Sequence, residues 1–152
     1  MAPLEKLKTL GLELPPSPKA IAAYIPAKSS GKLIFTSGQL PMKDGKLLHA
    51  GKLGNEVDLE SGKQCAQTAC LNGLAAIVGL LGDLEKISRI IKIGVYVAST
   101  PDFREHHLVA NSASELLVNI WGDNGNHARF AIGVPSLPLN APVELEIIAE
   151  MK

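Results

Sequence analysis

The sequence has few aromatic residues, no excess of either charge and only two cysteines. Aromatic residues make up 4% of the 152 residues, which leaves little for stacking nucleobases. Fifteen basic residues balance fifteen acidic ones, so no overall field attracts nucleic acid or an anionic membrane surface. No apolar run reaches the roughly 18 residues of a membrane span, and the N-terminus lacks signal-peptide features. We therefore expect a cytoplasmic protein without nucleic-acid or membrane partners.

Several common kinds of functional site are also missing from the sequence. There is no phosphate-binding loop, no dinucleotide fingerprint, no HExxH motif and no nucleophile elbow. His106 and His107 are neighbours on an expected helix, about 100° apart around its axis, so they cannot share a metal. Cys65 and Cys70 lie roughly 140° apart on another helix and are expected to be separate buried thiols. We expect neither a metal nor a cofactor.

The first third of the chain is expected to enter the fold through short elements. An apolar fraction of 46% and a charged fraction of 20% indicate one globular domain over residues 1–152. We expect a helix at 3–12 with Leu4, Leu7 and Leu10 on one side and Gly11 at its end, followed by a stiff proline linker at 14–18. After the linker we expect a strand at 20–26, a turn at 29–31, a strand at 32–39 and an exposed hairpin or loop at 41–57.

The rest of the chain alternates helices and strands. Asp58 is a good N-cap for a helix that Gly82 would end. The expected inner stripe of that helix is Ala66, Ala69, Cys70, Gly73, Ile77, Leu80 and Leu81. Residues 90–98 are almost all apolar, as in a strand buried on both faces. We further expect a helix from Thr100-Pro101 to Gly122, a turn at 122–126, and strands at 127–134 and 143–151.

The predicted order is β-β-α-β-α-β-β, an α+β mixed sheet with two helices. Two helices can cover only one face of a sheet of four to six strands. The apolar strand at 90–98 nevertheless predicts cover on both faces. We expect the second cover to come from another subunit, so the protein should be an oligomer.

One arginine stands out in the last quarter of the sequence. Arg129 is a lone cation in an apolar strand, where burial is costly unless a negative group meets it. That group could be the carboxylate of Glu144 or an anionic ligand held through two parallel hydrogen bonds. We expect both: Arg129 binding a substrate carboxylate and Glu144 handling a water beside it. On spacing alone, each polar residue of this set also has a purely structural explanation, including a cross-strand ion pair.

Four segments together resemble one known family. They are IAAYIPA at 21–27, IFTSGQLP at 34–41, HARFAIGVPSLP at 127–138 and VELEIIAE at 143–150. The chain resembles the Rid family, also called YjgF or endoribonuclease L-PSP, and in particular a longer subgroup with an N-terminal helix. The resemblance implies a chorismate-mutase-like fold of the bacterial AroH type, assembled as a homotrimer with clefts between subunits. Members that are enzymes hydrolyse 2-imino acids, or their enamine tautomers, to 2-keto acids and ammonia.

The resemblance also implies roles for individual residues. Arg129 resembles the family's carboxylate-binding arginine, and Glu144 resembles its water-positioning glutamate. The remaining expected substrate-binding residues are Tyr24, Ser37, Gly38, Asn111, Phe130 and Ala131. The match of Asn111 to the family's helix asparagine requires one inserted helical turn before it.

The chain departs from the family pattern beside the arginine. Ala131 stands where the deaminases usually have a cysteine, and Phe130 replaces a small polar residue. Imine hydrolysis needs no protein nucleophile, so these changes bear on substrate range and rate. Two alternatives stay open: a non-catalytic trimer that binds a small carboxylic or 2-keto acid, and the ribonuclease that the family's old name suggests.

Overall fold

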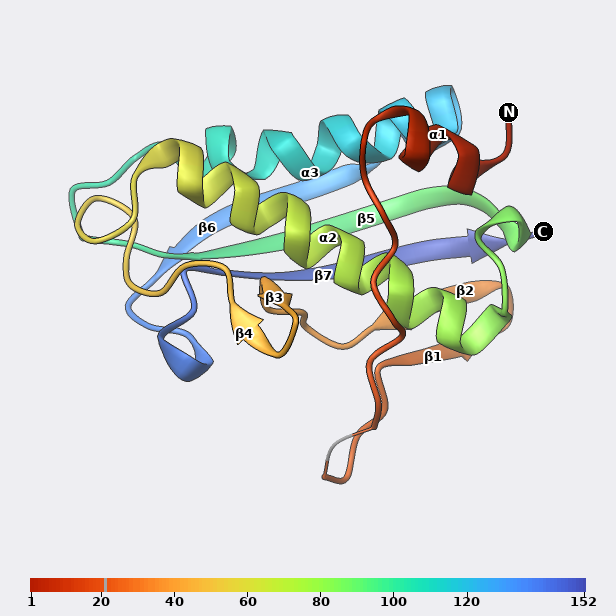
Figure 1. Cartoon of the computed structure of the whole chain (residues 1–152), viewed down its shortest axis with the longest axis horizontal. Helices are drawn as coiled ribbons and strands as arrows, with labels where there is room; N and C mark the ends of the chain where they lie inside the picture. Colours follow the sequence, from red (N-terminus) through yellow and green to blue (C-terminus); the bar gives the residue numbers. More distant parts are fainter. Residues whose placement is uncertain (21) are drawn as a thin grey trace.

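The computed structural model describes residues 1–20 and 22–152 and contains a sheet crossed on one face by two long helices (Figure 1). The elements are α1 (Pro3–Thr9), β1 (Ala27–Ser30), β2 (Leu33–Thr36), β3 (Met42–Lys43), β4 (Lys46–Leu47), α2 (Leu59–Leu81), β5 (Ile87–Ala98), α3 (His106–Trp121), β6 (Ala128–Val134) and β7 (Val143–Met151). Short 3₁₀ turns lie at Leu84–Lys86, Gly122–Gly125 and Pro138–Asn140.

The main sheet has the strand order β1-β2-β7-β5-β6. Only β5 and β6 pair in parallel, because α3 connects them as a crossover; the other pairs are antiparallel. The small β3-β4 hairpin forms a separate two-stranded ribbon. The predicted α+β class, the order β-β-α-β-α-β-β and the mixed sheet are therefore confirmed.

Helix α2 has the predicted ends and packs on the sheet through a small residue, Gly73. The Asp58 carboxylate accepts the backbone N–H of Ser61 at 2.8 Å, and Gly82 ends the helix with a φ of +87°. A Cβ atom on Gly73 would lie 2.8 Å from Cδ1 of Ile147, so a larger residue where α2 crosses β7 would require the Ile147 side chain to shift. Leu80 departs from the predicted stripe, since 41% of its surface is exposed.

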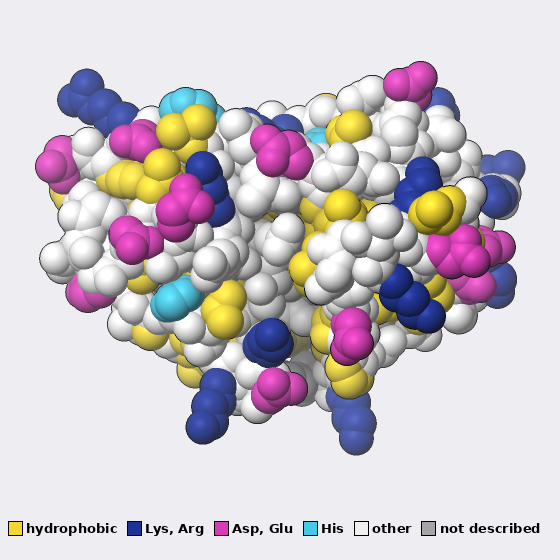
Figure 2. Space-filling model, turned by 45° about the horizontal axis from the view of Figure 1, so that its top comes forward, with side chains coloured by type: hydrophobic (Ala, Val, Ile, Leu, Met, Phe, Trp, Pro, Cys, Tyr) yellow, Lys and Arg dark blue, Asp and Glu magenta, His cyan; other side chains and the backbone are white. Residues whose placement is uncertain are grey.

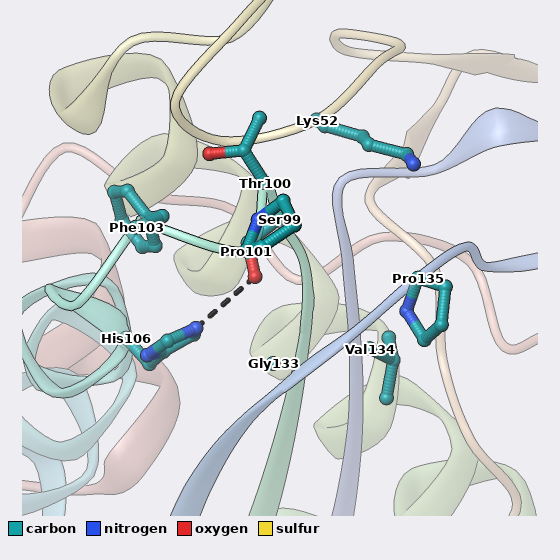
Figure 3. Close-up of a pocket in the computed structure, with 9 residues that line it drawn as sticks. All are labelled: Lys52, Ser99, Thr100, Pro101, Phe103, His106, Gly133, Val134 and Pro135. Carbon is teal, nitrogen blue, oxygen red and sulfur yellow. Dashed lines mark hydrogen bonds between the residues drawn. The ribbon is translucent and has the colours of Figure 1, made fainter.

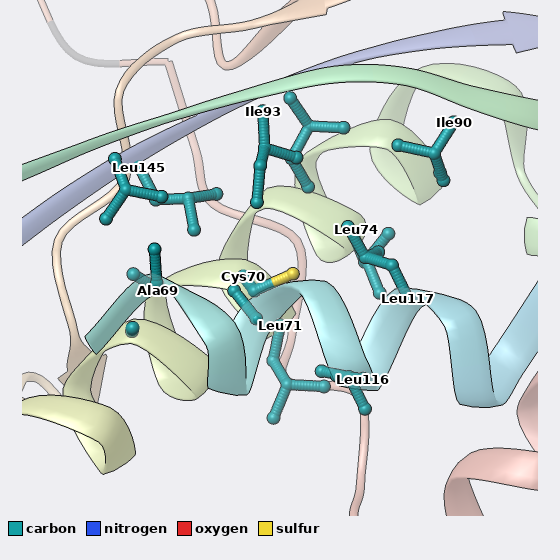
Figure 4. Close-up of a cluster of buried hydrophobic side chains, with 14 of the residues drawn as sticks. Ala69, Cys70, Leu71, Leu74, Ile90, Ile93, Leu116, Leu117 and Leu145 are labelled. Carbon is teal, nitrogen blue, oxygen red and sulfur yellow. The ribbon is translucent and has the colours of Figure 1, made fainter. Parts of the chain in front are cut away.

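The core fills the space between the helices and one face of the sheet. Figure 4 shows residues of α2 and α3 meeting Ile90, Ile93 and Leu145 of the strands. Cys65 and Cys70 are both buried and free, as predicted. Burial raises the pKa of the Cys65 thiol to about 11 and that of Cys70 to about 12. By length and hydropathy α2 could cross a membrane, but more than half of it is buried in this core.

Two predicted boundaries are wrong. The first strand is Ala27–Ser30 rather than 20–26, because Ala22 has a φ of +59°, which a strand cannot accommodate; Ile21 lies outside the described residues. Helix α3 begins at His106 and not at Thr100, whose backbone N–H is bonded to Leu53 O at 3.0 Å.

Other predictions for the first third of the chain hold only in part. Of the leucines expected to share the inner side of α1, only Leu7 is buried. Residues 14–18 lie in neither a helix nor a strand, and the Ser17 hydroxyl fixes this segment to α2 by donating to Ala75 O at 2.8 Å. The segment 41–57 does contain a hairpin, but Leu53 and Val57 within it are buried.

The face of the sheet opposite the helices is uncovered. Phe35 and Ile148 are paired across β2 and β7, and 41% of the Phe35 surface is exposed. Tyr96 and Phe130 meet edge to face on the same side, with ring centroids 5.2 Å apart. In a single chain β5 is therefore covered on one face only, as expected of one subunit, and the second cover from another subunit stays a prediction.

Candidate functional site

Arg129 lies on β6, at the edge of the sheet, and its side chain turns toward α3. Its strand partner is Ile93, a core residue, which places Arg129 on the face that the helices cover. The guanidinium donates through Nη1 to Asn111 Oδ1 at 2.9 Å and to Ser114 Oγ at 3.2 Å. We call Arg129, Asn111 and Ser114 the arginine cluster. The structure thus places two of the predicted site residues, Arg129 and Asn111, in contact.

His127 contacts the arginine cluster through Ser114. Nε2 of His127 lies 2.9 Å from Ser114 Oγ, and its Nδ1 lies 2.6 Å from Gly125 O. Because a carbonyl only accepts, Nδ1 carries the proton and Nε2 accepts the Ser114 hydroxyl. Burial and the charge of Arg129 lower the pKa of His127, although the bond to Gly125 opposes them. This neutral histidine leaves Ser114 an oxygen lone pair with which to hold the guanidinium.

The charge of Arg129 is met by neutral acceptors. In the described part of the chain no carboxylate lies within 4 Å of its guanidinium; the ion pairs there are Lys63–Glu60 and Arg89–Glu150. Its third contact, to His107 O, is at the 3.5 Å limit. A half-buried guanidinium held in this way keeps its capacity for an external anion.

Glu144 lies on β7, and its pKa is raised by burial and by the neighbouring carboxylate of Glu146. Gly38 makes room for it, because a Cβ atom there would lie 2.7 Å from Glu144 Oε1. Ser37 is bonded through Oγ to Ile25 O at 2.6 Å, which fixes it beside the segment that carries Tyr24. We call Glu144, Gly38 and Ser37 the glutamate cluster.

Within one chain the two clusters face opposite sides of the sheet. Glu144 is paired with Tyr96 on the uncovered face, whereas Arg129 is paired with Ile93 on the covered face. Strand β5 separates β7 from β6, so their backbones are about 10 Å apart. The expected pairing of Arg129 with a water-handling Glu144 does not exist inside a single chain, and these two residues form no cross-strand ion pair there.

The other predicted residues divide between the same two faces. Ala131 shares the side of β6 that Arg129 occupies, two residues further along. Phe130 points to the uncovered face, where the Lys92 ammonium lies 5.4 Å from its ring centroid. Tyr24 is 57% exposed. The sequence prediction missed Ser114 and His127, although both spacings can be read from the sequence. Ser114 comes three residues after Asn111 on α3, and His127 comes two residues before Arg129, just before β6.

Comparison with known proteins identifies the family. Residues 5–151 match the family described as "YjgF/chorismate_mutase-like, putative endoribonuclease". Protein TCP17 of Trypanosoma cruzi is 36% identical over 146 residues, covering 95% of this chain and 91% of its own.

Solved structures share the fold over nearly the whole chain. Protein Atu1372 of Agrobacterium tumefaciens, of unknown function, superposes with a TM-score of 0.93 at 44% identity, covering 99% of this chain and 92% of that one. TdcF of E. coli, solved with bound serine, has the same fold at 23% identity and a TM-score of 0.59, covering 90% and 94%. The chain therefore belongs to the YjgF family and has its chorismate-mutase-like α+β fold.

Proposed function

We propose that this protein is a Rid-type deaminase that hydrolyses 2-iminoalkanoates, or their enamine tautomers, to 2-keto acids and ammonia. One observation carries the proposal: the Arg129 guanidinium is positioned by neutral acceptors alone at a sheet edge. A purely structural role requires no cation there, whereas the carboxylate of a small imino acid fits it through two parallel hydrogen bonds.

The proposed reaction requires few groups from the protein. Arg129 would orient the substrate through its carboxylate, and a protonated imine carbon is already electrophilic. Glu144, with its raised pKa, would take a proton from a water that adds to this carbon. Glu144 would return this proton to the nitrogen of the resulting carbinolamine. Ammonia would then leave as the C–N bond breaks, and the hydroxyl proton would pass to Glu144 as the ketone forms. Asn111 would keep the guanidinium in place.

The site would be completed between subunits of a homotrimer. The arginine and glutamate clusters face opposite sides of one sheet, so a second copy is the simplest way to bring them together. The uncovered face, with Phe35, Tyr96 and Phe130, supplies apolar surface for such an assembly. Light scattering should give the mass of a trimer; a monomeric mass would contradict this part of the proposal.

A non-catalytic carboxylate-binding protein is the second candidate. Ala131 lacks the sulfur that the deaminases carry, and the fold accommodates a small amino acid in TdcF. Ribonuclease activity is less well supported. Figure 2 shows basic and acidic side chains interspersed over the face in view, without the basic track that a nucleic-acid backbone requires. The reduced, buried thiols fit our further proposal that the protein is cytoplasmic.

Semicarbazide competition tests the function directly. An amino-acid oxidase generates imino acids from a series of amino acids, and semicarbazide traps whatever the protein leaves unhydrolysed. We expect the protein to suppress semicarbazone formation in proportion to its concentration. Binding of 2-keto acids without any such suppression would reject the deaminase and select the second candidate.

A further inference from the structure

A pocket of about 410 Å³ opens where β5 and β6 end and α3 begins (Figure 3). The residues on which its chemistry depends are Lys52, Ser99, Thr100, Phe103, His106 and Gly133. None of them belongs to the arginine or glutamate cluster.

A serine and a histidine meet on one side of this pocket. Ser99 Oγ lies 3.1 Å from Nε2 of His106, and burial with the charge of His107 lowers the pKa of His106. A Cβ atom on Gly133 would lie 2.5 Å from Nε2 of His106 and 2.7 Å from Ser99 Oγ. Gly133 has no positive φ, so the glycine serves to leave space in front of this pair.

The polar groups of the pocket favour an anion. Lys52 and Thr100 also line the pocket, and Figure 3 shows Lys52 on a different side of it from the Ser99–His106 pair. None of the described lining residues carries a carboxylate. Glu56 binds the backbone N–H of Lys52 at 2.8 Å, but no ion pair within 4 Å is found for the Lys52 ammonium in the described part of the chain.

The pocket and the arginine cluster lie along the same pair of elements. Arg129, Ala131 and Gly133 alternate on one side of β6, so Arg129 and Gly133 are about 13 Å apart along the strand. Helix α3 runs beside them: Asn111 contacts Arg129, and His106 faces Gly133. A substrate bound by Arg129 could therefore extend past Ala131, which has only a methyl group, toward the pocket.

We propose that this pocket binds the distal carboxylate of a dicarboxylic 2-imino acid whose proximal carboxylate is bound by Arg129. The assignment rests on the proposed function and names its substrate class. Binding fits the geometry better than nucleophilic chemistry by Ser99. Only 9% of the Ser99 surface is exposed, and among the described residues no hydrogen-bond partner orients Nδ1 of His106.

Calorimetry with the full-length protein tests the pocket without requiring turnover. The ligands are 2-oxo acids of four, five and six carbons, each with a terminal carboxylate, compared with the monocarboxylic 2-oxo acid of equal length. At one length we expect the dicarboxylate to bind at least about tenfold more tightly. Lys52→Met should remove that advantage by taking away the charge, and Gly133→Ala by filling the space. Lys46→Met, at an exposed position outside the pocket, is the matched control and should preserve it.

The outcomes separate the pocket from the catalytic proposal. If no dicarboxylate is preferred at any length, or if Lys52→Met and Gly133→Ala keep the preference, the pocket assignment is wrong even when imines are hydrolysed. A preference that Lys52→Met removes upholds the pocket even when the semicarbazide assay shows no hydrolysis. Hydrolysis of p-nitrophenyl acetate that Ser99→Ala abolishes would instead make Ser99 a nucleophile and overturn the assignment.

Discussion

The arginine cluster and the glutamate cluster are built in opposite ways. Arg129 is fixed by side-chain hydrogen bonds from a neighbouring helix, and its charge stays free for a ligand. Glu144 is surrounded by close backbone and a second carboxylate, so burial and Glu146 raise its pKa. In the proposed function, the arginine cluster would bind a negative charge and Glu144 would accept a proton. Neither is a complete site in one chain, because the sheet stands between them.

The largest expected effect comes from removing the guanidinium. Arg129→Ala should lower kcat/KM for imine hydrolysis on the order of a thousandfold, since a bidentate charged contact is lost. Arg129→Lys keeps the charge without the planar fork and should recover only part of that loss. Light scattering should show an unchanged oligomer for both. A wild-type rate for the alanine variant would remove Arg129 from the mechanism.

Replacing the carboxylate of Glu144 should affect kcat more than KM. Glu144→Gln keeps the shape but cannot accept a proton, and general-base catalysis contributes about 10²–10⁴-fold. In the wild type, kcat should fall as the pH drops through the raised pKa of Glu144 and the base form disappears. The acid limb of the pH profile reports this directly, and an unchanged kcat for Glu144→Gln would contradict the assignment.

We also expect Glu144→Gln to change how stability depends on pH. A carboxyl with a raised folded-state pKa stabilises the fold at low pH, and that contribution is lost as the pH rises through this pKa. Glu144→Gln should therefore melt at a higher temperature than the wild type at pH 8, and the difference should shrink toward pH 4. Calorimetry at both values checks the sign. A lower melting temperature at pH 8 would mean that the ionised carboxylate is stabilised in place.

A smaller effect is expected from the support behind the arginine. Ser114→Ala removes one acceptor from the guanidinium and should raise KM roughly fivefold with little change in kcat. Asn111 still holds Nη1 in this variant, so the loss should stay well below that of Arg129→Ala. Equal losses in the two variants would mean that Ser114 does more than position the arginine.

The smallest effect serves as a control distant from both clusters. Asp58→Ala removes the N-cap of α2 and should lower the Tm by roughly 2–4 °C. Activity at 25 °C should not change. If Asp58→Ala lowered kcat/KM as Ser114→Ala does, losses in this protein would reflect stability and not the clusters.

The sequence predicted features that depend on local chemistry. The ends of α2 follow from Asp58 and Gly82, and the alternation along β7 follows from residues 143–151. Features that depend on contacts between residues far apart in the sequence could not be predicted from it. Thr100 pairs with Leu53 O, which delays α3 until His106, and nothing near residue 100 in the sequence signals that contact.

The candidate site also has a part that the sequence predicted and a part that it could not predict. Arg129 and Asn111 could be predicted because a family pattern joins them, and the structure brings them together. The sequence could not predict that Arg129 and Glu144 lie on opposite faces of the sheet, because their faces follow from the register of β6 and β7 on β5. The Ser99–His106 pair was missed because helix-end histidines carry no pattern, and β5 and α3 meet there only in the fold.

Mixing two inactive variants tests the central claim most directly. Arg129→Ala and Glu144→Gln subunits, unfolded together and refolded at equal amounts, form mixed oligomers. If each site takes Arg129 from one subunit and Glu144 from its neighbour, about a quarter of the sites regain both residues, and imine hydrolysis returns to roughly that fraction of wild type. If the mixture stays as inactive as its components while wild type refolds to full activity, the two clusters do not form one site across the interface.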